Sequence, residues 1–150
     1  MKAAVRDLRY PLTVFYDASC PLCATEMLAL KERDREARLD LVDCSAPDFD
    51  DTVLAGTGIS RADLMARIHA RDAHGRWLVA LDAFEATYRA AGVERAARLW
   101  GARGMRPVLD PLYCWVARRR QLLSRLGAGR LVRRLIGALA SPAGESGRRL

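Results

Sequence analysis

The 150-residue sequence has no uninterrupted apolar run near the roughly 18 residues that a membrane-spanning helix requires. Its first residues are broken by Lys2, Arg6 and Asp7, so they lack the apolar stretch of a secretory signal. It also lacks a glycine-rich phosphate-binding loop, a Ser-His-Asp set and a paired-carboxylate site. We therefore expect a cytoplasmic globular protein that uses none of these chemistries.

Acidic residues are scarce in the last third of the chain. Residues 101–150 contain 11 Lys and Arg against 2 Asp and Glu, whereas residues 1–100 contain 14 against 16. The net charge of +7 is therefore local, which favours a basic surface over a uniformly basic nucleic-acid-binding protein. Aromatic residues do not intersperse these arginines, so we expect no nucleic-acid partner.

The hydrophobic period changes twice in the first third of the chain. Residues 12–16 (LTVFY) form a β-branched and aromatic run that predicts a buried strand. From Pro21 the apolar residues recur at helical spacing, and residues 38–43 alternate as a second strand. This order of strand, helix and strand predicts a parallel pair with a right-handed crossover.

The pattern continues to residue 92. We expect a loop with one helical turn over 44–58, a helix that Ser60 begins with a capping box, a hairpin of strands at 66–71 and 77–80, and a helix from Asp82 to Ala91. The fold class is therefore α/β, with a thioredoxin-like β-α-β-(α)-β-β-α core over residues 10–92.

The remainder of the chain predicts an added C-terminal helical extension over residues 93–140, followed by a disordered tail at 141–150. We expect its helices at 93–100, 110–126 and 130–140. The last helix has an apolar arc opposite Arg130, Arg133 and Arg134. Docking of this helix onto the core is favoured; contact with a partner or an anionic membrane surface is the alternative.

Two cysteines spaced by two residues, Cys20 and Cys23, lie where the first strand gives way to the first helix. The unpaired N–H groups and the dipole at a helix N-terminus favour a thiolate there. Thiol-disulfide exchange also needs a nearby second thiol to release the mixed disulfide. We therefore assign Cys20 as the nucleophile and Cys23 as the resolving thiol, with Pro21 stiffening the turn.

A zinc site uses the same spacing but needs two further ligands. The remaining candidates are scattered single residues: Cys44, Cys114, His69 and His74. We expect Cys44 and Cys114 to be small packed residues. We expect His69 and His74 to be exposed on the hairpin. The redox interpretation is therefore favoured, with no metal and no cofactor besides the dithiol.

Residues 16–23 (YDASCPLC) resemble the opening signature of the DCC family of thiol-disulfide oxidoreductases. Further matches over roughly residues 12–125 are Val42-Asp43, 46–49, 64–69, Ala83-Phe84 and Tyr113 with 117–120. The resemblance implies a thioredoxin-like fold and a disulfide reductase activity on a protein or small-thiol disulfide, with an external thiol as reductant. Tyr16 and Asp17 carry over as supporting residues.

Asp17 has two roles open to it: it could relay the proton of Cys23, or it could cap the turn, which is favoured. The sequence departs from the family where glycine is replaced by Ala18 and Ala80, and alanine is strained there if either position needs a positive φ. No proline lies between Pro47 and Pro107, so the cis-proline of thioredoxins is missing and substrate pairing of that type must differ.

Two functions therefore compete. The first is a thiol-disulfide oxidoreductase that uses Cys20 and Cys23. The alternative is a redox-inactive thioredoxin-fold binding module whose basic C-terminal helices engage a partner or an anionic membrane surface.

Overall fold

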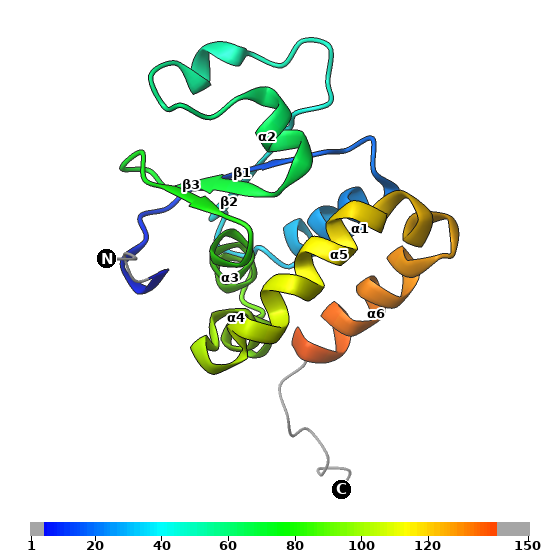
Figure 1. Ribbon diagram of the computed structural model, residues 1–150. Helices are drawn as coiled ribbons and strands as arrows, with labels where there is room; N and C mark the ends of the chain where they lie inside the picture. The colour runs from blue at the N-terminus through cyan, green and yellow to red at the C-terminus, as the bar shows by residue number, and fades with distance from the viewer. Residues whose placement is uncertain (1–4, 141–150) are drawn as a thin grey trace, which may run out of the picture.

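A four-stranded sheet with the order β2-β1-β3-β4 forms the centre of the computed structural model, which describes residues 5–140 (Figure 1). The four strands are β1 (Leu12–Tyr16), β2 (Leu39–Asp43), β3 (His69–Arg71) and β4 (Trp77–Val79). β1 pairs in parallel with β2 and antiparallel with β3, and β3 pairs antiparallel with β4. This mixed α/β arrangement confirms the predicted thioredoxin-like fold class.

The helices follow the strands in the expected order. Those of the core are α1 (Pro21–Lys31), α2 (Arg61–Ala66) and α3 (Leu81–Ala90), with short 3-10 turns η1 (Val5–Asp7) and η2 (Asp51–Leu54). The capping box predicted for α2 is present, because Ser60 and Asp63 hydrogen bond each other's backbone N–H. Gly92 follows α3 with a φ of 79°, a left-handed conformation that glycine adopts without strain.

The two faces of the sheet bury different side chains. On one face α1 and α3 pack against Leu12 and Val14, and this is the larger core. On the other face α2 and the long 44–60 loop cover Phe15, which stacks on Trp77 at 5.0 Å between ring centroids. Alternation along β1 therefore supplies both cores from one strand, as a central strand requires.

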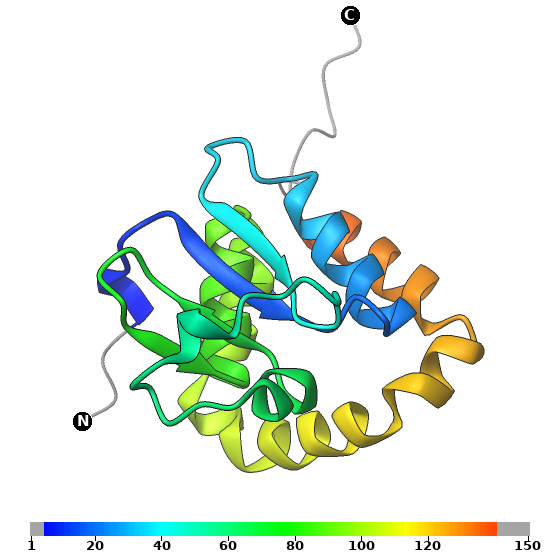
Figure 2. The ribbon, with the colours of Figure 1, turned by 90° about the horizontal axis from the view of Figure 1, so that it is seen from above.

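The helical extension comprises α4 (Glu94–Gly101), η3 (Arg103–Met105), α5 (Arg106–Arg125) and α6 (Ala128–Ala140). Figure 2 shows α6 lying beside α1. Gly129 allows this approach, because a Cβ there would lie 3.3 Å from the Thr25 hydroxyl oxygen. Arg133 also forms an ion pair with Glu32 across the same interface at 2.9 Å. The extension therefore packs against the helix that begins with the two cysteines.

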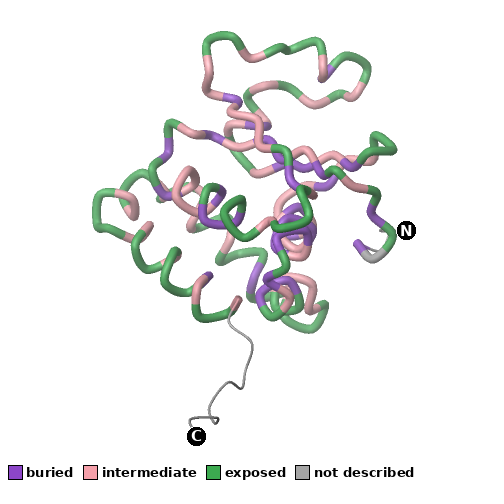
Figure 3. The backbone as a smooth tube through the Cα atoms, turned by 180° about the vertical axis from the view of Figure 1, so that it is seen from behind, coloured by how far each residue is buried: buried purple, intermediate pink, exposed green. Residues whose placement is uncertain are grey.

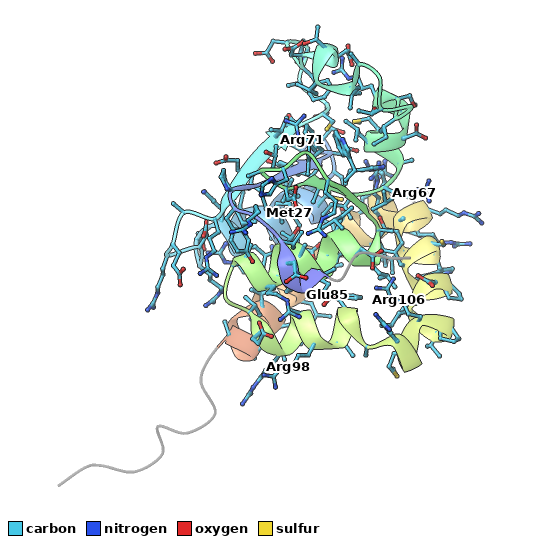
Figure 4. The ribbon with its side chains drawn as sticks, turned by 90° about the vertical axis from the view of Figure 1, so that its left-hand side faces the viewer. Met27, Arg67, Arg71, Glu85, Arg98 and Arg106 are labelled. Atoms are coloured by element: carbon cyan, nitrogen blue, oxygen red, sulfur yellow. The ribbon has the colours of Figure 1, made fainter. Side chains whose placement is uncertain are left out.

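Several helix starts differ from those predicted, including that of α6, which begins at Ala128 and not at residue 130. Ala80, and not Asp82, precedes α3, and Asp82 instead forms an ion pair with Arg106, labelled in Figure 4. α5 begins at Arg106, four residues before the predicted start, and includes Pro111 in its interior. Asp110-Pro111 imitates a helix start, but Pro107 already occupies the first turn, where a missing N–H costs nothing. The tail at 141–150 lies outside the described residues.

Candidate active site

The two cysteines lie at the N-terminal end of α1, next to the C-terminal end of β1. Cys20 is the N-cap residue of α1 and Pro21 occupies its first turn. The Cys23 backbone N–H donates to the Cys20 sulfur at 3.4 Å, so this sulfur takes the place of an N-cap oxygen. The local sequence therefore points the Cys20 sulfur at the positive end of the helix dipole.

The two thiols are in direct contact, and their pKa values move in opposite directions. The Cys23 thiol donates to the Cys20 sulfur, with 2.8 Å between the Sγ atoms. This hydrogen bond lowers the pKa of Cys20 to about 6 against the effect of burial, aided by the Cys23 N–H, Ser124 and the charge of Arg120. The same hydrogen bond and burial raise the pKa of Cys23. One thiolate and one thiol are therefore the stable pair at neutral pH.

Ser124, near the C-terminal end of α5, covers the dithiol. Its hydroxyl oxygen accepts a hydrogen bond from the Leu22 backbone N–H at 3.0 Å and lies 3.9 Å from the Cys20 sulfur. Cys20 is 0% exposed, whereas Cys23 is partly exposed. The helical extension therefore closes the site over the thiol that has the lower pKa.

Asp17 lies in the turn between β1 and Cys20, and it is buried. Its carboxylate accepts a hydrogen bond from the Ser19 backbone N–H at 3.0 Å, which makes the turn-capping contact. Its second oxygen forms an ion pair with Arg120 of α5 at 2.9 Å, and the same Arg120 nitrogen donates to the Met65 carbonyl oxygen at 2.6 Å. Asp17 therefore links the cysteine turn to α5 and, through Arg120, to α2.

A cavity of about 410 Å³ lies behind the dithiol, with α1, α3, α4, α5 and α6 around it. Its walls are mainly aliphatic and aromatic, and Tyr16, Cys23 and Glu26 contribute to its lining. Burial raises the pKa of Glu26 to about 7, although the hydrogen bond from the Tyr88 hydroxyl, at 2.6 Å, acts in the opposite direction. A carboxyl group that titrates near neutrality therefore lies one helical turn after Cys23.

Thioredoxins have a cis-proline just before the strand that corresponds to β3, and in this chain that position lies in the backbone that leads into β3. There the Ile68 N–H donates to the Tyr113 hydroxyl of α5 at 3.2 Å. Arg67, labelled in Figure 4, precedes it and is exposed at the rim of the cavity. The helical extension therefore pairs with the backbone N–H that leads into β3.

The two alanines that replace family glycines behave differently. Ala80 has a φ of 55° and a ψ of −122°, a conformation that only glycine adopts without strain. Ala18 is not among the residues with positive φ, and its N–H donates to Asp43 at 3.0 Å. Strain is therefore present at Ala80 and absent at Ala18.

Two of the scattered single residues differ from expectation. His69 is buried and not exposed, because β3 lies between β1 and β4 with both of its faces covered. Cys114 is exposed and not packed, because its neighbour Tyr113 turns inward on α5. Cys44 is buried as expected. Among residues 5–140, no group of three His, Cys, Asp or Glu side chains could hold a metal ion.

Glu26, Tyr88 and Ser124 are site residues that were not predicted from the sequence. The spacing of Glu26, three residues after Cys23, places both on neighbouring positions of one helix and could have drawn attention to it. Ser124 and Tyr88 have no such local signal, because 102 residues separate Ser124 from Leu22 and 62 separate Tyr88 from Glu26.

A sheet with this order, and a cysteine pair at the start of its first helix, define a thioredoxin-fold dithiol protein. The family model described as DCC1-like thiol-disulfide oxidoreductase matches residues 14–126, and the chain belongs to this family. The predicted family resemblance is therefore confirmed.

One curated relative is an uncharacterised chloroplastic protein of Arabidopsis thaliana, which is 28% identical over 85 residues. The alignment covers 56% of this chain and 39% of the relative, so the chain spans about two fifths of that protein. No solved structure matches the chain. Within residues 5–140, no helix has the length and apolar character needed to cross a membrane.

Proposed function

We propose that the protein reduces disulfides through Cys20 and Cys23, with Cys20 as the nucleophile. The observation that carries this proposal is the contact between the two sulfurs, 2.8 Å apart, with the lower pKa on the thiol at the helix N-terminus. A thiolate is the attacking species in disulfide exchange, and a neutral second thiol is held ready beside it. Membership of the oxidoreductase family supports the same assignment.

The reaction transfers two electrons from the dithiol to the substrate disulfide. The Cys20 thiolate attacks one sulfur of a substrate disulfide, forms a mixed disulfide and releases the other sulfur as a thiolate, which takes a proton from water. Cys23 then loses its proton and attacks the Cys20 sulfur, which frees the second substrate thiolate and leaves a Cys20–Cys23 disulfide. An external thiol returns the protein to its reduced state. We propose a protein or small-molecule disulfide as the substrate.

Glu26 is the group that takes the proton of Cys23 in the second step. It shares the cavity with Cys23, and its pKa of about 7 lets it act as a base at neutral pH. Tyr88 fixes the carboxyl group through its hydrogen bond. Asp17 is occupied by Arg120 and the turn, which supports a structural role for it and leaves the proton transfer to Glu26.

Attack by Cys20 requires the C-terminal end of α5 to move, because Cys20 is 0% exposed. Ser124 attaches this end to the start of α1 through the Leu22 N–H. A substrate must therefore displace the Ser124 contact before it reaches the sulfur.

The first experiment titrates the ultraviolet absorbance of the thiolate in the reduced protein, which needs no access to the sulfur. Wild type is expected to show a transition near pH 6, and Cys20→Ser is expected to lose it. Cys23→Ser is expected to trap a mixed disulfide with a model disulfide substrate, detected as a mass increase, while Cys20→Ser traps none. Reduction of the substrate should require both cysteines.

A titration of Cys20 near the value of a free thiol, roughly 8.5, would contradict the proposal. So would trapping through Cys23 in the Cys20→Ser variant, because the roles of the two thiols would then be reversed. Cys44→Ser is a suitable control, since this buried thiol has its pKa raised and takes no part in either step.

A further inference from the structure

The exposed apolar side chains of this protein are concentrated on the helical extension. Apart from Leu28, every large apolar side chain classed as exposed within residues 5–140 lies between Leu99 and Leu139. Figure 3 shows exposed positions along the extension, whereas the buried ones gather at the sheet and α3. Monomeric proteins do not usually expose so many apolar side chains together, and such surfaces mark sites that bind a protein or a membrane.

These side chains follow the helical period on both helices. On α5 their spacings are four, three and seven residues, and on α6 four residues, so each helix has one apolar stripe. We define the basic apolar face by these residues and the exposed arginines among them: Val108, Leu112, Trp115, Leu122, Leu126, Leu131, Leu135, Leu139, Arg118, Arg119, Arg125, Arg130 and Arg134.

The two stripes converge on one surface. Leu112 of α5 and Leu135 and Leu139 of α6 all line the mouth of the same cavity, yet they are 49%, 50% and 36% exposed. Leu126, at the α5–α6 turn, is 75% exposed. This turn follows Ser124 directly, so the face reaches the end of α5 that covers the dithiol.

The charge on this face has a single sign. Residues 111–140 contain seven arginines and no Asp or Glu. Four of the arginines, Arg118, Arg125, Arg130 and Arg134, are exposed and form no ion pair with any residue in the described part of the chain. Arg119 lies over the Trp115 ring at 5.8 Å. A second copy of this face would bring arginine against arginine, so the charge selects an anionic partner.

We infer that the basic apolar face binds the surface of an anionic lipid bilayer. Leucine and tryptophan side chains on one arc of a helix insert among the headgroups and upper acyl chains, while flanking arginines bind the lipid phosphates. A fluid lipid surface adapts to two helices at an angle, whereas a protein partner would need a matching shape. Binding in this orientation places the dithiol end of α1 and the mouth of the cavity at the lipid surface.

The test measures co-sedimentation of the full chain with vesicles of phosphatidylcholine, either alone or mixed with phosphatidylglycerol. Wild type is expected to bind the mixed vesicles, to bind phosphatidylcholine alone at least tenfold more weakly, and to be released by high salt. Combining Arg125→Gln, Arg130→Gln and Arg134→Gln is expected to weaken binding at least tenfold. Combining Leu126→Ser with Leu131→Ser is expected to do the same, because insertion is lost.

Matched controls lie elsewhere on the surface. Arg9→Gln with Arg35→Gln removes two exposed arginines outside the face, and Leu28→Ser removes an exposed leucine of α1. These variants are expected to bind like wild type. All changed residues are exposed, so circular dichroism and the thermal midpoint should stay close to wild type and show that folding is intact.

Three outcomes would overturn the inference. The first is no binding to the mixed vesicles at low salt, and the second is equal binding to neutral and anionic vesicles. The third is binding that the arginine and leucine variants leave unchanged. If wild type ignores vesicles but binds polyglutamate in a way that the arginine variant abolishes, the face docks an acidic protein instead of a membrane.

Discussion

Arg120 and Asp17 form an ion pair at 2.9 Å although 103 residues separate them in the chain. Asp17 lies in the turn before Cys20, and Arg120 lies on α5. The pair therefore joins the most specific part of the sequence motif to the helical extension. Arg120 also lowers the pKa of Cys20 through its charge, so one side chain serves both the stability and the chemistry of the site.

Arg120→Gln should destabilise the protein by about 3 kcal/mol, because it leaves the buried Asp17 carboxylate without its cation. Adding Asp17→Asn should recover part of that loss, since the unpaired charge disappears. Denaturant unfolding measures both effects. Arg119→Gln, on the exposed neighbouring position, should change stability by no more than about 0.5 kcal/mol. Additive losses in the double variant would show that the two side chains are not coupled.

Ser124→Ala should make Cys20 more accessible and raise its pKa. The substitution removes the contact with the Leu22 N–H, and it removes a hydrogen bond that favours the Cys20 thiolate. The rate of Cys20 alkylation in the folded protein is measured across pH by mass spectrometry. Greater access appears as a faster rate on the high-pH plateau, and the raised pKa appears as a midpoint above about 6. Unchanged rates would show that α5 does not limit access to Cys20.

Glu26→Gln should alter the pH dependence of stability. The folded pKa of about 7 lies above the ordinary carboxyl value, so the folded state holds this proton more tightly than the unfolded state does. The associated stability is present at low pH and is lost as pH rises from about 4.5 towards 7. Above that range the variant should be more stable than wild type by about 3 kcal/mol. Denaturant midpoints from pH 4 to 8 measure the difference.

The same variant should resolve the mixed disulfide more slowly, because Cys23 loses its proton acceptor. A slowing of about tenfold or more near pH 7, with first attack by Cys20 unchanged, would distinguish proton transfer from a structural role. Tyr88→Phe is the matched comparison, since it keeps the carboxyl group and removes only its hydrogen bond. Equal resolution rates in wild type and Glu26→Gln would contradict the role.

Ala80→Gly should stabilise the protein by about 1 kcal/mol, because glycine relieves the positive φ of 55° at this position. Ala18→Gly should instead destabilise by about 0.5–1 kcal/mol, since Ala18 has no positive φ and glycine only adds chain entropy to the unfolded state. Thermal unfolding of the two variants side by side checks the opposite signs.

Short-range features were readable from the sequence because their partners lie within a few residues. β1 has the predicted bounds, Leu12–Tyr16, and the Ser60–Asp63 capping box forms as expected. The N-cap position of Cys20 likewise follows from Pro21 and the change of period. Strand alternation, helix capping and proline placement all act within one or two turns of the chain.

The tertiary structure alone decided which distant groups meet. No local pattern could pair Arg120 with Asp17, bring Tyr88 to Glu26 or place Ser124 over Cys20. The rotation of α5 about its axis sets Tyr113 inward and Cys114 outward, and the central position of β3 buries His69. The sequence by itself determined the dithiol and the fold class, because both depend on local backbone preference. The cover of the dithiol and the access route to it depend on how the helical extension packs against α1, whereas Glu26 of α1 meets Tyr88 through the packing of α1 and α3.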